Sequence, residues 1–307
     1  MNVIAIDTGG TKIMGAVVDD GGSILEKVKY ENTGRTGPFI LNTYCKIIDG
    51  FLRKHRISAI GIGAGGRIDT ETGRVVFAAG IYQDYIGCEI KKTIEERFRI
   101  PTTVDNDCKV AVLGESWASP VKKFGNVFGL ILGTGVGGGI LYNGRMIGGT
   151  HGGAGEIGHW ILHPDGRPCT CGQNGCVEQY LSGTALWSLY NEKCGADTIQ
   201  SGYAFFSRVS RKDAAALQVL DGFVRDLAVL SVSCANLFDP QAILFGGGLL
   251  DTYPYWWDAF TEQYAALGNV HTKHVELIRA ANGNSAAILG AAYLALQISS
   301  QSADQRR

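Results

Sequence analysis

The sequence contains no hydrophobic run of the ~18 residues that a membrane-spanning helix needs. Its N-terminus also has no basic stretch followed by a long apolar run, so a signal peptide is not expected. Neither charge sign dominates, because 28 Lys and Arg residues face 29 Asp and Glu residues for a formal net charge of −1. Without a basic run, binding to nucleic acid is not expected. These absences predict a cytoplasmic protein with no membrane or nucleic-acid partner and with reduced thiols.

The sequence also lacks the evenly distributed cysteines of a disulfide framework. Five of the eight cysteines stand far apart, as buried and inert thiols commonly do: Cys45, Cys88, Cys108, Cys194 and Cys234. The other three, Cys169, Cys171 and Cys176, fall within the eight residues CTCGQNGC. In a reducing compartment, such a cluster is more typical of a metal site than of disulfides.

Three thiolates need one further ligand to complete the Cys₃His tetrahedron of a structural zinc site. Two imidazoles are near in sequence, His159 at ten residues before Cys169 and His163 at six residues before it. We favour His159, because His163 precedes Pro164 and has the setting of a surface turn. The alternatives are reduced thiols without a metal and an iron–sulfur cluster, which would usually need a fourth cysteine.

Glycine is abundant, with 43 of 307 residues, about twice the usual share of ~7%. This excess indicates many tight turns and close approaches of the backbone to a ligand. No P-loop of the pattern G-x-x-x-x-G-K-[ST] is present. The pattern G-x-G-x-x-G occurs at 61–66 and at 133–138, but strands rather than helices are expected after it. We therefore reject a dinucleotide-binding fold.

A pattern of strand, glycine turn and hairpin begins at residue 3 and again at residue 127. The first copy predicts an antiparallel meander, and the second predicts a strand at 127–132, a glycine turn at 133–139 and a hairpin. Further strands are expected at 59–65, 102–107 and 242–248, and helices at 38–55, 89–98, 184–194, 212–237, 254–266 and 285–298. The repeat predicts two duplicated α/β domains around a central cleft, at 1–118 and 119–307. The last helix is a candidate for packing back on the first domain.

Two of the glycine turns have the residues of a phosphate cradle, because backbone N–H groups of small residues can approach an anion closely. The first turn follows Asp7 at a strand end and consists of Thr8, Gly9, Gly10, Thr11 and Lys12. The second turn consists of Gly133, Thr134 and Gly135. We expect the two turns to hold the triphosphate of ATP, with Asp7 binding Mg²⁺ through water.

Four motifs together resemble the ROK family of repressors, open reading frames and sugar kinases. They are DTGGTK at 7–12, DND at 105–107, LGTGVGGGILYNGRMIGGTHGGAGEIGH at 132–159 and CTCGQNGCVE at 169–178. They occur in the family's order and with its spacing over nearly the whole chain. The resemblance implies an α/β protein with the actin-like ATPase (ribonuclease H-like) fold, which binds a sugar and Mg-ATP and is often a homodimer.

The resemblance also implies roles for individual residues. Asp107 corresponds to the catalytic base of the family. Contacts with the sugar are implied for Gly66, Asn106, Asp107, Glu156, His159 and Glu178. The glycines Gly246, Gly247 and Gly248 resemble the adenosine-side motif, and the structural zinc site of the family matches His159, Cys169, Cys171 and Cys176.

The activity implied is that of an ATP:hexose 6-phosphotransferase of the hexokinase or glucokinase type. Glucose is the first substrate expected, N-acetylmannosamine or N-acetylglucosamine is the alternative, and fructose or a β-glucoside comes after these. A sugar-sensing regulator without catalysis is the alternative from another class. Such regulators carry a helix-turn-helix domain ahead of the first phosphate turn, whereas six residues precede Asp7 here.

The chain departs from the family pattern at two places near the expected sugar pocket. Gly65 stands where the family commonly has proline, and AAGIYQDYIG at 78–87 stands where the family often has Asn and Trp. We expect this segment to form a wall of the pocket, with Tyr82 or Tyr85 either crowding an N-acetyl group or stacking on it.

Overall fold

A computed structural model of the chain describes residues 1–78 and 82–304, with side chains up to residue 300. The chain divides into two compact units. The first unit contains Met1–Lys123, Met146–Gly155 and the chain from Asn284 onward, and the second contains Phe124–Arg145 and Glu156–Gly283. The domain boundary expected between residues 118 and 119 stays a prediction.

The first unit is built on a five-stranded sheet in the order β3-β2-β1-β4-β7. β1 (Asn2–Thr8), β2 (Lys12–Asp19) and β3 (Ile24–Glu31) form the expected antiparallel meander. β4 (Ile60–Ala64) and β7 (Thr102–Asn106) continue the sheet in parallel to β1. A short hairpin of β5 (Arg67–Asp69) and β6 (Arg74–Phe77) follows β4.

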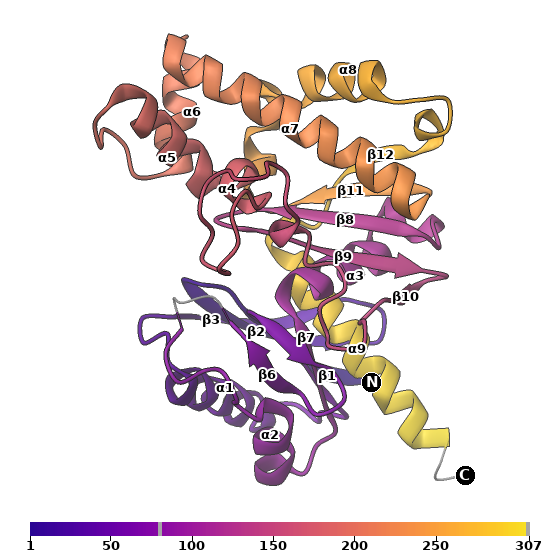
Figure 1. The fold of residues 1–307 in the computed structure, drawn as a ribbon. Helices are drawn as coiled ribbons and strands as arrows, with labels where there is room; N and C mark the ends of the chain where they lie inside the picture. Colours follow the sequence, from indigo (N-terminus) through magenta and orange to yellow (C-terminus); the bar gives the residue numbers. More distant parts are fainter. Residues whose placement is uncertain (79–81, 305–307) are drawn as a thin grey trace. The chain divides into compact units, whose positions relative to one another are not determined.

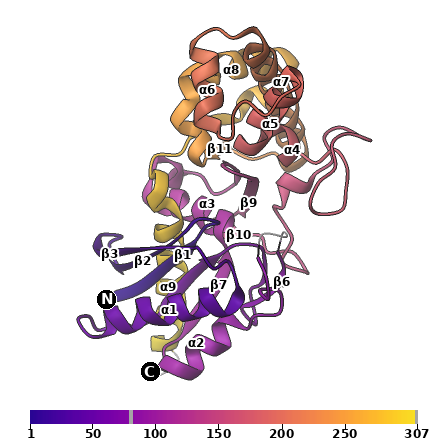
Figure 2. The same cartoon turned by 90° about the vertical axis from the view of Figure 1, so that its left-hand side faces the viewer.

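Helices cover both faces of this sheet, and the side-chain alternation of β1 shows how. Ile4 and Ile6 pack in one hydrophobic cluster with residues of α1 (Gly37–Leu52) and α2 (Ile90–Phe98). Val3 and Ala5 point to the opposite face and pack with α9 (Ala286–Asp304). Figure 1 and Figure 2 both show α1 and α2 side by side in this unit. Since both faces are buried, β1 reads as a continuous apolar run.

The second unit is built on a sheet in the order β10-β9-β8-β11-β12. β8 (Val127–Leu132) and β9 (Val136–Tyr142) are antiparallel, and β10 (Arg145–Met146) follows β9. β11 (Ala242–Gly246) and β12 (Glu276–Arg279) are parallel to β8. The glycine turn expected at 133–139 is therefore shorter than predicted, because residues 136–139 lie within β9 and pair with β8.

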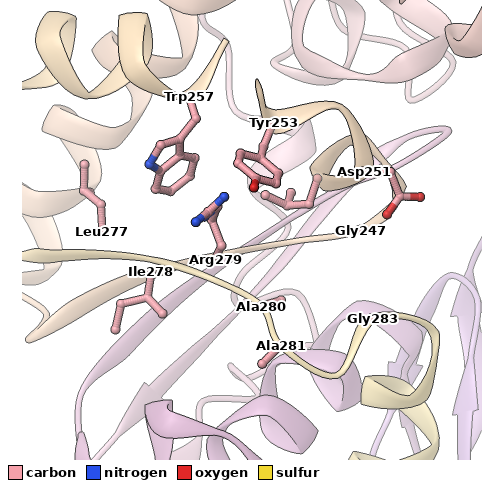
Figure 3. A pocket seen from close by; sticks show the side chains of 11 residues that line it. Gly247, Asp251, Tyr253, Trp257, Leu277, Ile278, Arg279, Ala280, Ala281 and Gly283 are labelled. Atoms are coloured by element: carbon pink, nitrogen blue, oxygen red, sulfur yellow. The ribbon is translucent and has the colours of Figure 1, made fainter. Parts of the chain in front are cut away.

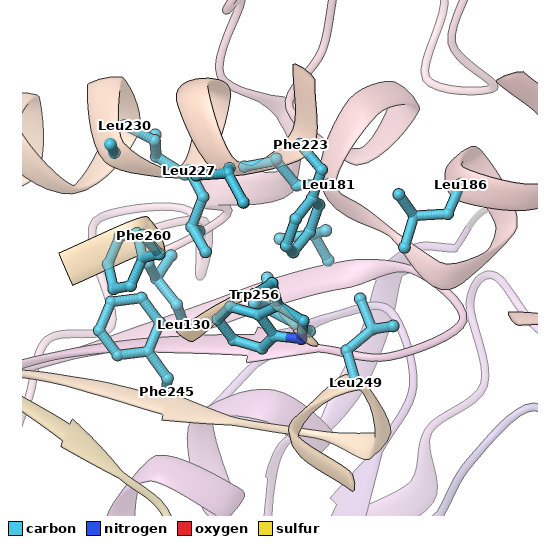
Figure 4. Packing of buried hydrophobic residues seen from close by; sticks show 14 of the residues in the cluster. Leu130, Leu181, Leu186, Phe223, Leu227, Leu230, Phe245, Leu249, Trp256 and Phe260 are labelled. Carbon is cyan, nitrogen blue, oxygen red and sulfur yellow. The ribbon is translucent and has the colours of Figure 1, made fainter. Parts of the chain in front are cut away.

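One large hydrophobic cluster fills the second unit. It joins β8 and β11 to the helices α4 (Glu178–Leu181), α5 (Gly183–Cys194), α6 (Gly202–Ser210), α7 (Ala214–Phe238) and α8 (Trp257–Leu267). Trp256 is fully buried in it, with its ring edge-on to Phe223 at 5.4 Å between centroids (Figure 4). Trp256 is therefore a packing residue of this core.

The remaining short elements are 3₁₀ helices. They are η1 (Pro120–Lys123), η2 (Ile157–His159), η3 (Gly248–Tyr255), η4 (Thr272–His274) and η5 (Gly283–Ser285). Among the residues that the structure describes, no helix combines the length and the apolar character needed to cross a membrane.

The helix that follows β7, α3 (Asp107–Ala118), packs against α9 through two glycines. A methyl group on Gly290 would overlap the carbonyl oxygen of Val110 and stand 2.9 Å from the backbone nitrogen of Gly114. Any side chain at this contact would therefore push the two helices apart.

We expect Gly290→Ala to lower the free energy of unfolding by at least ~1–3 kcal/mol, as overpacking typically does. The control is Gly50→Ala in α1, where a methyl group would meet no atom within 4 Å. This control should be neutral or stabilising by up to about 1 kcal/mol, because Ala is the better helix former. Urea unfolding measures both, and equal stability of the two variants would contradict the tight packing of α3 on α9.

Candidate active site and metal centre

The residue expected to act as the base lies where a strand passes directly into a helix. β7 ends at Asn106, and α3 begins at Asp107. Oδ1 of Asn106 accepts hydrogen bonds from the N–H groups of Cys108 and Lys109, at 3.0 and 3.1 Å. Its Nδ2 donates to the carbonyl of Gly66 at 2.9 Å and to Oδ1 of Asp107 at 3.0 Å. One carboxamide therefore caps the helix and holds both the glycine turn and the carboxylate.

Asn106 uses the full hydrogen-bonding capacity of its carboxamide within the protein, with two N–H donors and two accepting lone pairs. A contact between Asn106 and a sugar hydroxyl stays a prediction that requires one of these bonds to be exchanged. Oδ1 of Asp107 also accepts from the N–H of Cys108 at 2.9 Å. The helix dipole favours a negative charge at this position.

Lys109 is a buried cation that the sequence did not identify. Its exposed fraction is 1%, and its Nζ donates to the carbonyl of Gly152 at 2.7 Å. Burial raises the pKa of nearby Asp105, while the N–H of Asn106 and the charge of Lys109 act in the opposite direction. Lysine is rarely buried, and the stretch DCKVAV gives no signal for the burial of Lys109.

The first phosphate turn is supported by a buried side chain from outside the motif. The N–H of Gly9 donates to the carbonyl of Lys12 at 3.0 Å, which closes the turn. Asn32 is 2% exposed, and its Nδ2 donates to the carbonyl of Gly9 at 3.0 Å. The backbone N–H of Asn32 donates to the carbonyl of Thr11 at 2.9 Å. Asn32 thus fixes the turn. It directly follows β3, and no sequence motif around it indicates this role.

Asp7 lies in β1 directly before Thr8, whose hydroxyl is hydrogen-bonded to that of Tyr44 at 2.7 Å. Burial raises the pKa of Asp7 to about 6, although the charges of Lys12 and Lys27 lower it. A carboxylate that is costly to ionise in the free protein gains from a hydrated cation beside it. The position therefore suits the expected Mg²⁺, which would bind through oxygen ligands and water.

The second phosphate turn joins β8 to β9 and is held from one side by α4 and α5. Within the turn, the N–H of Gly133 donates to the carbonyl of Gly135 at 2.9 Å. The N–H of Gly183 donates to the carbonyl of Gly133 at 2.8 Å. Oε2 of Glu178 accepts from the N–H of Val136, the residue after the turn, at 2.9 Å.

The cysteine cluster and one histidine come together as a metal-binding group. Ligand atoms of His159, Cys169, Cys171 and Cys176 all lie within 4.8 Å of one another. Nδ1 of His159 is 3.8 Å from Sγ of Cys169, and Sγ atoms of Cys171 and Cys176 are 3.6 Å apart. Zinc–sulfur bonds of ~2.3 Å in a tetrahedron separate two sulfurs by about this distance. The donor set therefore fits a tetrahedral metal ion, for which His159 would supply the one nitrogen ligand.

The alternative ligand His163 has another partner. Its Nε2 is 2.9 Å from Oδ2 of Asp226 in α7, and its ring stands edge-on to that of Tyr180 at 4.4 Å between centroids. Since His163 is absent from the metal-binding group, the structure places His159 there, as favoured from the sequence.

The expected adenosine-side glycines lie at the end of β11. Gly246 is the last residue of the strand, and Gly248 begins η3. Between them, Gly247 has φ of +88°, and a side chain there would overlap the backbone of Leu132. Glycine is thus required at 247 both for its backbone conformation and for its packing.

A cavity of about 730 Å³ opens beside Gly247. Its walls come from η3, α8 and β12, and three of its side chains present flat surfaces (Figure 3). The guanidinium carbon of Arg279 lies 3.8 Å from the ring centroid of Tyr253 and 5.4 Å from that of Trp257. No sequence pattern points to Arg279, because no strand is expected around it.

The expected sugar ligands come from both units. Gly66, Asn106 and Asp107 belong to the first unit, where hydrogen bonds connect all three. Glu156 and His159 belong to the second unit, in and before η2, and the carbonyl of Glu156 accepts from the N–H of His159 at 3.1 Å. The sixth expected sugar ligand is Glu178, whose carboxylate is hydrogen-bonded to the residue after the second phosphate turn.

Comparison with known proteins identifies the family and the fold of the chain. The sequence profile of the ROK family matches residues 3–298. The chain is 34% identical to a glucokinase of Streptomyces coelicolor, covering 95% of this chain and 96% of the relative. It is 30% identical to an N-acetyl-D-glucosamine kinase of Escherichia coli O127:H6, covering 94% of this chain and 98% of the relative. A ROK family glucokinase from Streptomyces griseus, solved with glucose and AMPPNP, superposes with a TM-score of 0.84 at 31% identity. The superposition covers 97% of this chain and 100% of the glucokinase chain. The chain belongs to the ROK family and has the actin-like ATPase fold of its sugar kinases.

Proposed function

We propose that the protein is an ATP-dependent hexose kinase that phosphorylates the 6-hydroxyl of glucose or a closely related aldohexose. Relatives named as glucokinases, at 34% identity over almost the whole chain, support this activity. The observation that carries the proposal is the carboxylate of Asp107, which the amide of Asn106 and a backbone N–H hold at the start of α3.

In the proposed reaction, Asp107 orients the sugar hydroxyl and accepts its proton as the oxygen attacks the γ-phosphorus of ATP. The new bond joins this oxygen to phosphorus, the bond to the β-phosphate oxygen breaks, and ADP leaves. Phosphoryl transfer needs mainly positioning and neutralisation of charge. The two phosphate turns supply backbone N–H groups for this purpose, and Mg²⁺ beside Asp7 supplies positive charge when bound. The cavity at Gly247, with Tyr253 and Arg279, offers flat surfaces for the adenosine.

Glucose is the substrate we propose first, and the surroundings of Tyr82 support it. Residues 79–81 of the expected pocket wall lie outside the described residues. Tyr85 is 1% exposed and packs against the ring of Tyr82 at 4.9 Å, so it is part of the core. The hydroxyl of Tyr82 lies only 3.0 Å from where a Cβ on Gly65 would stand. Tyr82 therefore occupies the space that a larger residue at 65 would fill, which favours a small sugar substituent.

An N-acetylhexosamine kinase is the second candidate, because relatives at 30% identity are named N-acetyl-D-glucosamine kinases. We further propose that the metal is structural zinc, that the protein is cytoplasmic and that it forms a homodimer. The donor set of three thiols and one imidazole supports zinc, and the family resemblance supports the dimer.

We expect coupled ADP release with Mg-ATP and glucose, a lower kcat/KM with N-acetylglucosamine or N-acetylmannosamine, and no turnover of 6-deoxyglucose. Asp107→Asn should lower kcat by ~10²–10⁴-fold, as loss of a general base typically does. Its affinity for glucose should stay within about tenfold of the native value, because the replacement keeps the size and most hydrogen bonds. Near-native turnover of this variant would mean that another group is the base.

We expect about one zinc ion per chain by elemental analysis. Cys171→Ser should lose both the metal and thermal stability, because a structural metal contributes folding free energy. Cys194→Ser is the matched control, since Cys194 is exposed and stands outside the metal-binding group. Full zinc content and an unchanged melting temperature for Cys171→Ser would contradict the proposed site.

We expect Asp7→Asn to stabilise the ligand-free protein at pH 8 but not at pH 4. Burial raises the folded-state pKa from 3.8 to about 6, so between these values the folded state holds more protons than the unfolded state. The stability of the native protein therefore falls as the pH rises through this window, and the full cost remains above it. Removing the charge should recover about 1–3 kcal/mol at pH 8 in urea unfolding. The same variant should also bind Mg-ATP more weakly. A difference in stability between variant and native protein that does not change with pH would contradict the raised pKa of Asp7.

A further inference from the structure

Val136, the first residue after the second phosphate turn, is contacted by both segments that carry metal ligands. On one side, Oε2 of Glu178 accepts a hydrogen bond from its N–H at 2.9 Å. On the other side, a Cβ on Gly158 in η2 would overlap the carbonyl oxygen of Val136, so the two backbones are in direct contact. Glu178 follows the ligand Cys176 by two residues, and Gly158 directly precedes the ligand His159.

The carboxylate of Glu178 also restricts the turn itself. A Cβ on Gly135 would overlap Oε2 of Glu178, so this carboxylate occupies the space beside the glycine. The other end of the turn is held by the N–H of Gly183, which donates to the carbonyl of Gly133 at 2.8 Å. Both ends of the turn are thus tied to α4 and the start of α5, the segment that leaves the metal-binding loop.

A metal ion would join the two segments that contact Val136. The group of four ligands includes His159 from η2 and Cys176 from the loop before α4. The backbone supports the same arrangement, since the N–H of Val177 donates to the carbonyl of Trp160 at 2.9 Å. The amide of Gln173 also donates to the carbonyl of His159 at 3.0 Å. The donor set fits a tetrahedral ion, which would add a direct link between the two segments to these hydrogen bonds.

We propose that Glu178 is a positioning residue for the nucleotide, through which the metal centre holds the second phosphate turn in its phosphate-binding shape. Metal occupancy then sets the affinity for ATP even when no sugar is bound. This inference rests on the proposed use of ATP as phosphoryl donor. It gives Glu178 two tasks, because Oε2 holds the turn while the family resemblance implies that the same side chain contacts the sugar.

The two carboxylates proposed as sugar ligands therefore differ in a measurable way. Glu156 stands three residues before His159, and of these two carboxylates only Glu178 accepts a hydrogen bond from the N–H of Val136 among the described residues. Removing Glu156 should affect the sugar alone, whereas removing Glu178 should affect both substrates. Glutamine at 178 keeps a side-chain oxygen that can accept from the N–H of Val136 and loses only the charge.

The test is calorimetric titration of Mg-AMPPNP into the purified full-length protein without sugar. We expect Glu178→Ala and Cys171→Ser to raise the Kd for Mg-AMPPNP by about tenfold or more, the usual loss for a hydrogen bond to a charged group. Glu178→Gln should restore the Kd to within about threefold of the native value. Glu156→Ala should keep the native Kd while weakening the binding of glucose. Removing zinc from the native protein with a chelator should raise the Kd, and adding zinc back should lower it again.

Equal Kd values for Glu178→Ala and the native protein would overturn the inference, as would a Glu178→Gln variant that binds as weakly as Glu178→Ala. Gly135→Ala is a second route to the same turn, since its side chain would displace the carboxylate, and native affinity in this variant also counts against the inference. With any of these results, the proposed function still holds as long as the native protein binds Mg-AMPPNP. Failure of the native, zinc-loaded protein to bind Mg-AMPPNP at all would instead overturn the proposed function.

Discussion

The geometry of the proposed base depends on one side chain, the carboxamide of Asn106. Its four hydrogen bonds join the end of β7, the first turn of α3, the backbone of Gly66 and the carboxylate of Asp107. Each bond is ordinary in strength, and one of the four reaches the carboxylate, which also accepts from the N–H of Cys108. The helix that carries this carboxylate is in turn fixed by α9, whose Gly290 touches the backbone of α3. The C-terminal helix of the chain thereby supports a site formed near residue 107.

The two phosphate turns have the same proposed task but are held by different means. The first turn is fixed from within its own unit by the buried amide of Asn32. The second turn is fixed by Glu178, and so by the loop that bears the metal ligands. The partly buried carboxylate of Asp7 has its pKa raised by desolvation, a perturbation that is common where a site is built for a charged ligand. The two phosphate turns are thus held by unlike means, and among the described residues the group that could bind a metal lies in the second unit.

Hydrophobic pattern and motif spacing predicted most of the fold and the metal-binding group. The meander at the N-terminus, the strand at 127–132 and the long helix ending at Phe238 all follow from apolar runs or periodicity. The run Gly137–Gly139 was read as a turn, because glycine is rare in strands. It lies in β9 instead, where its carbonyl and N–H groups pair with β8.

Other features could not be predicted because tertiary contacts determine them. α3 was missed, since helix contacts bury several of its sides and even Lys109, which leaves little amphipathic pattern. β12 is a four-residue edge strand with exposed ends, so Arg279 and the cavity beside it had no signal. Asn32 and Glu178 hold the two turns, and each lies far in sequence from the turn that it holds.

The most direct test of the account is to identify the product that the native protein makes from glucose and Mg-ATP. Phosphorus and proton NMR of the reaction mixture distinguish phosphorylation at the 6-hydroxyl from phosphorylation elsewhere on the ring. The account predicts glucose 6-phosphate and ADP in equal amounts, with no other phosphorylated sugar. Binding of glucose and of Mg-ATP without any phosphorylated hexose would contradict it, and would indicate a sugar-sensing protein in place of a kinase.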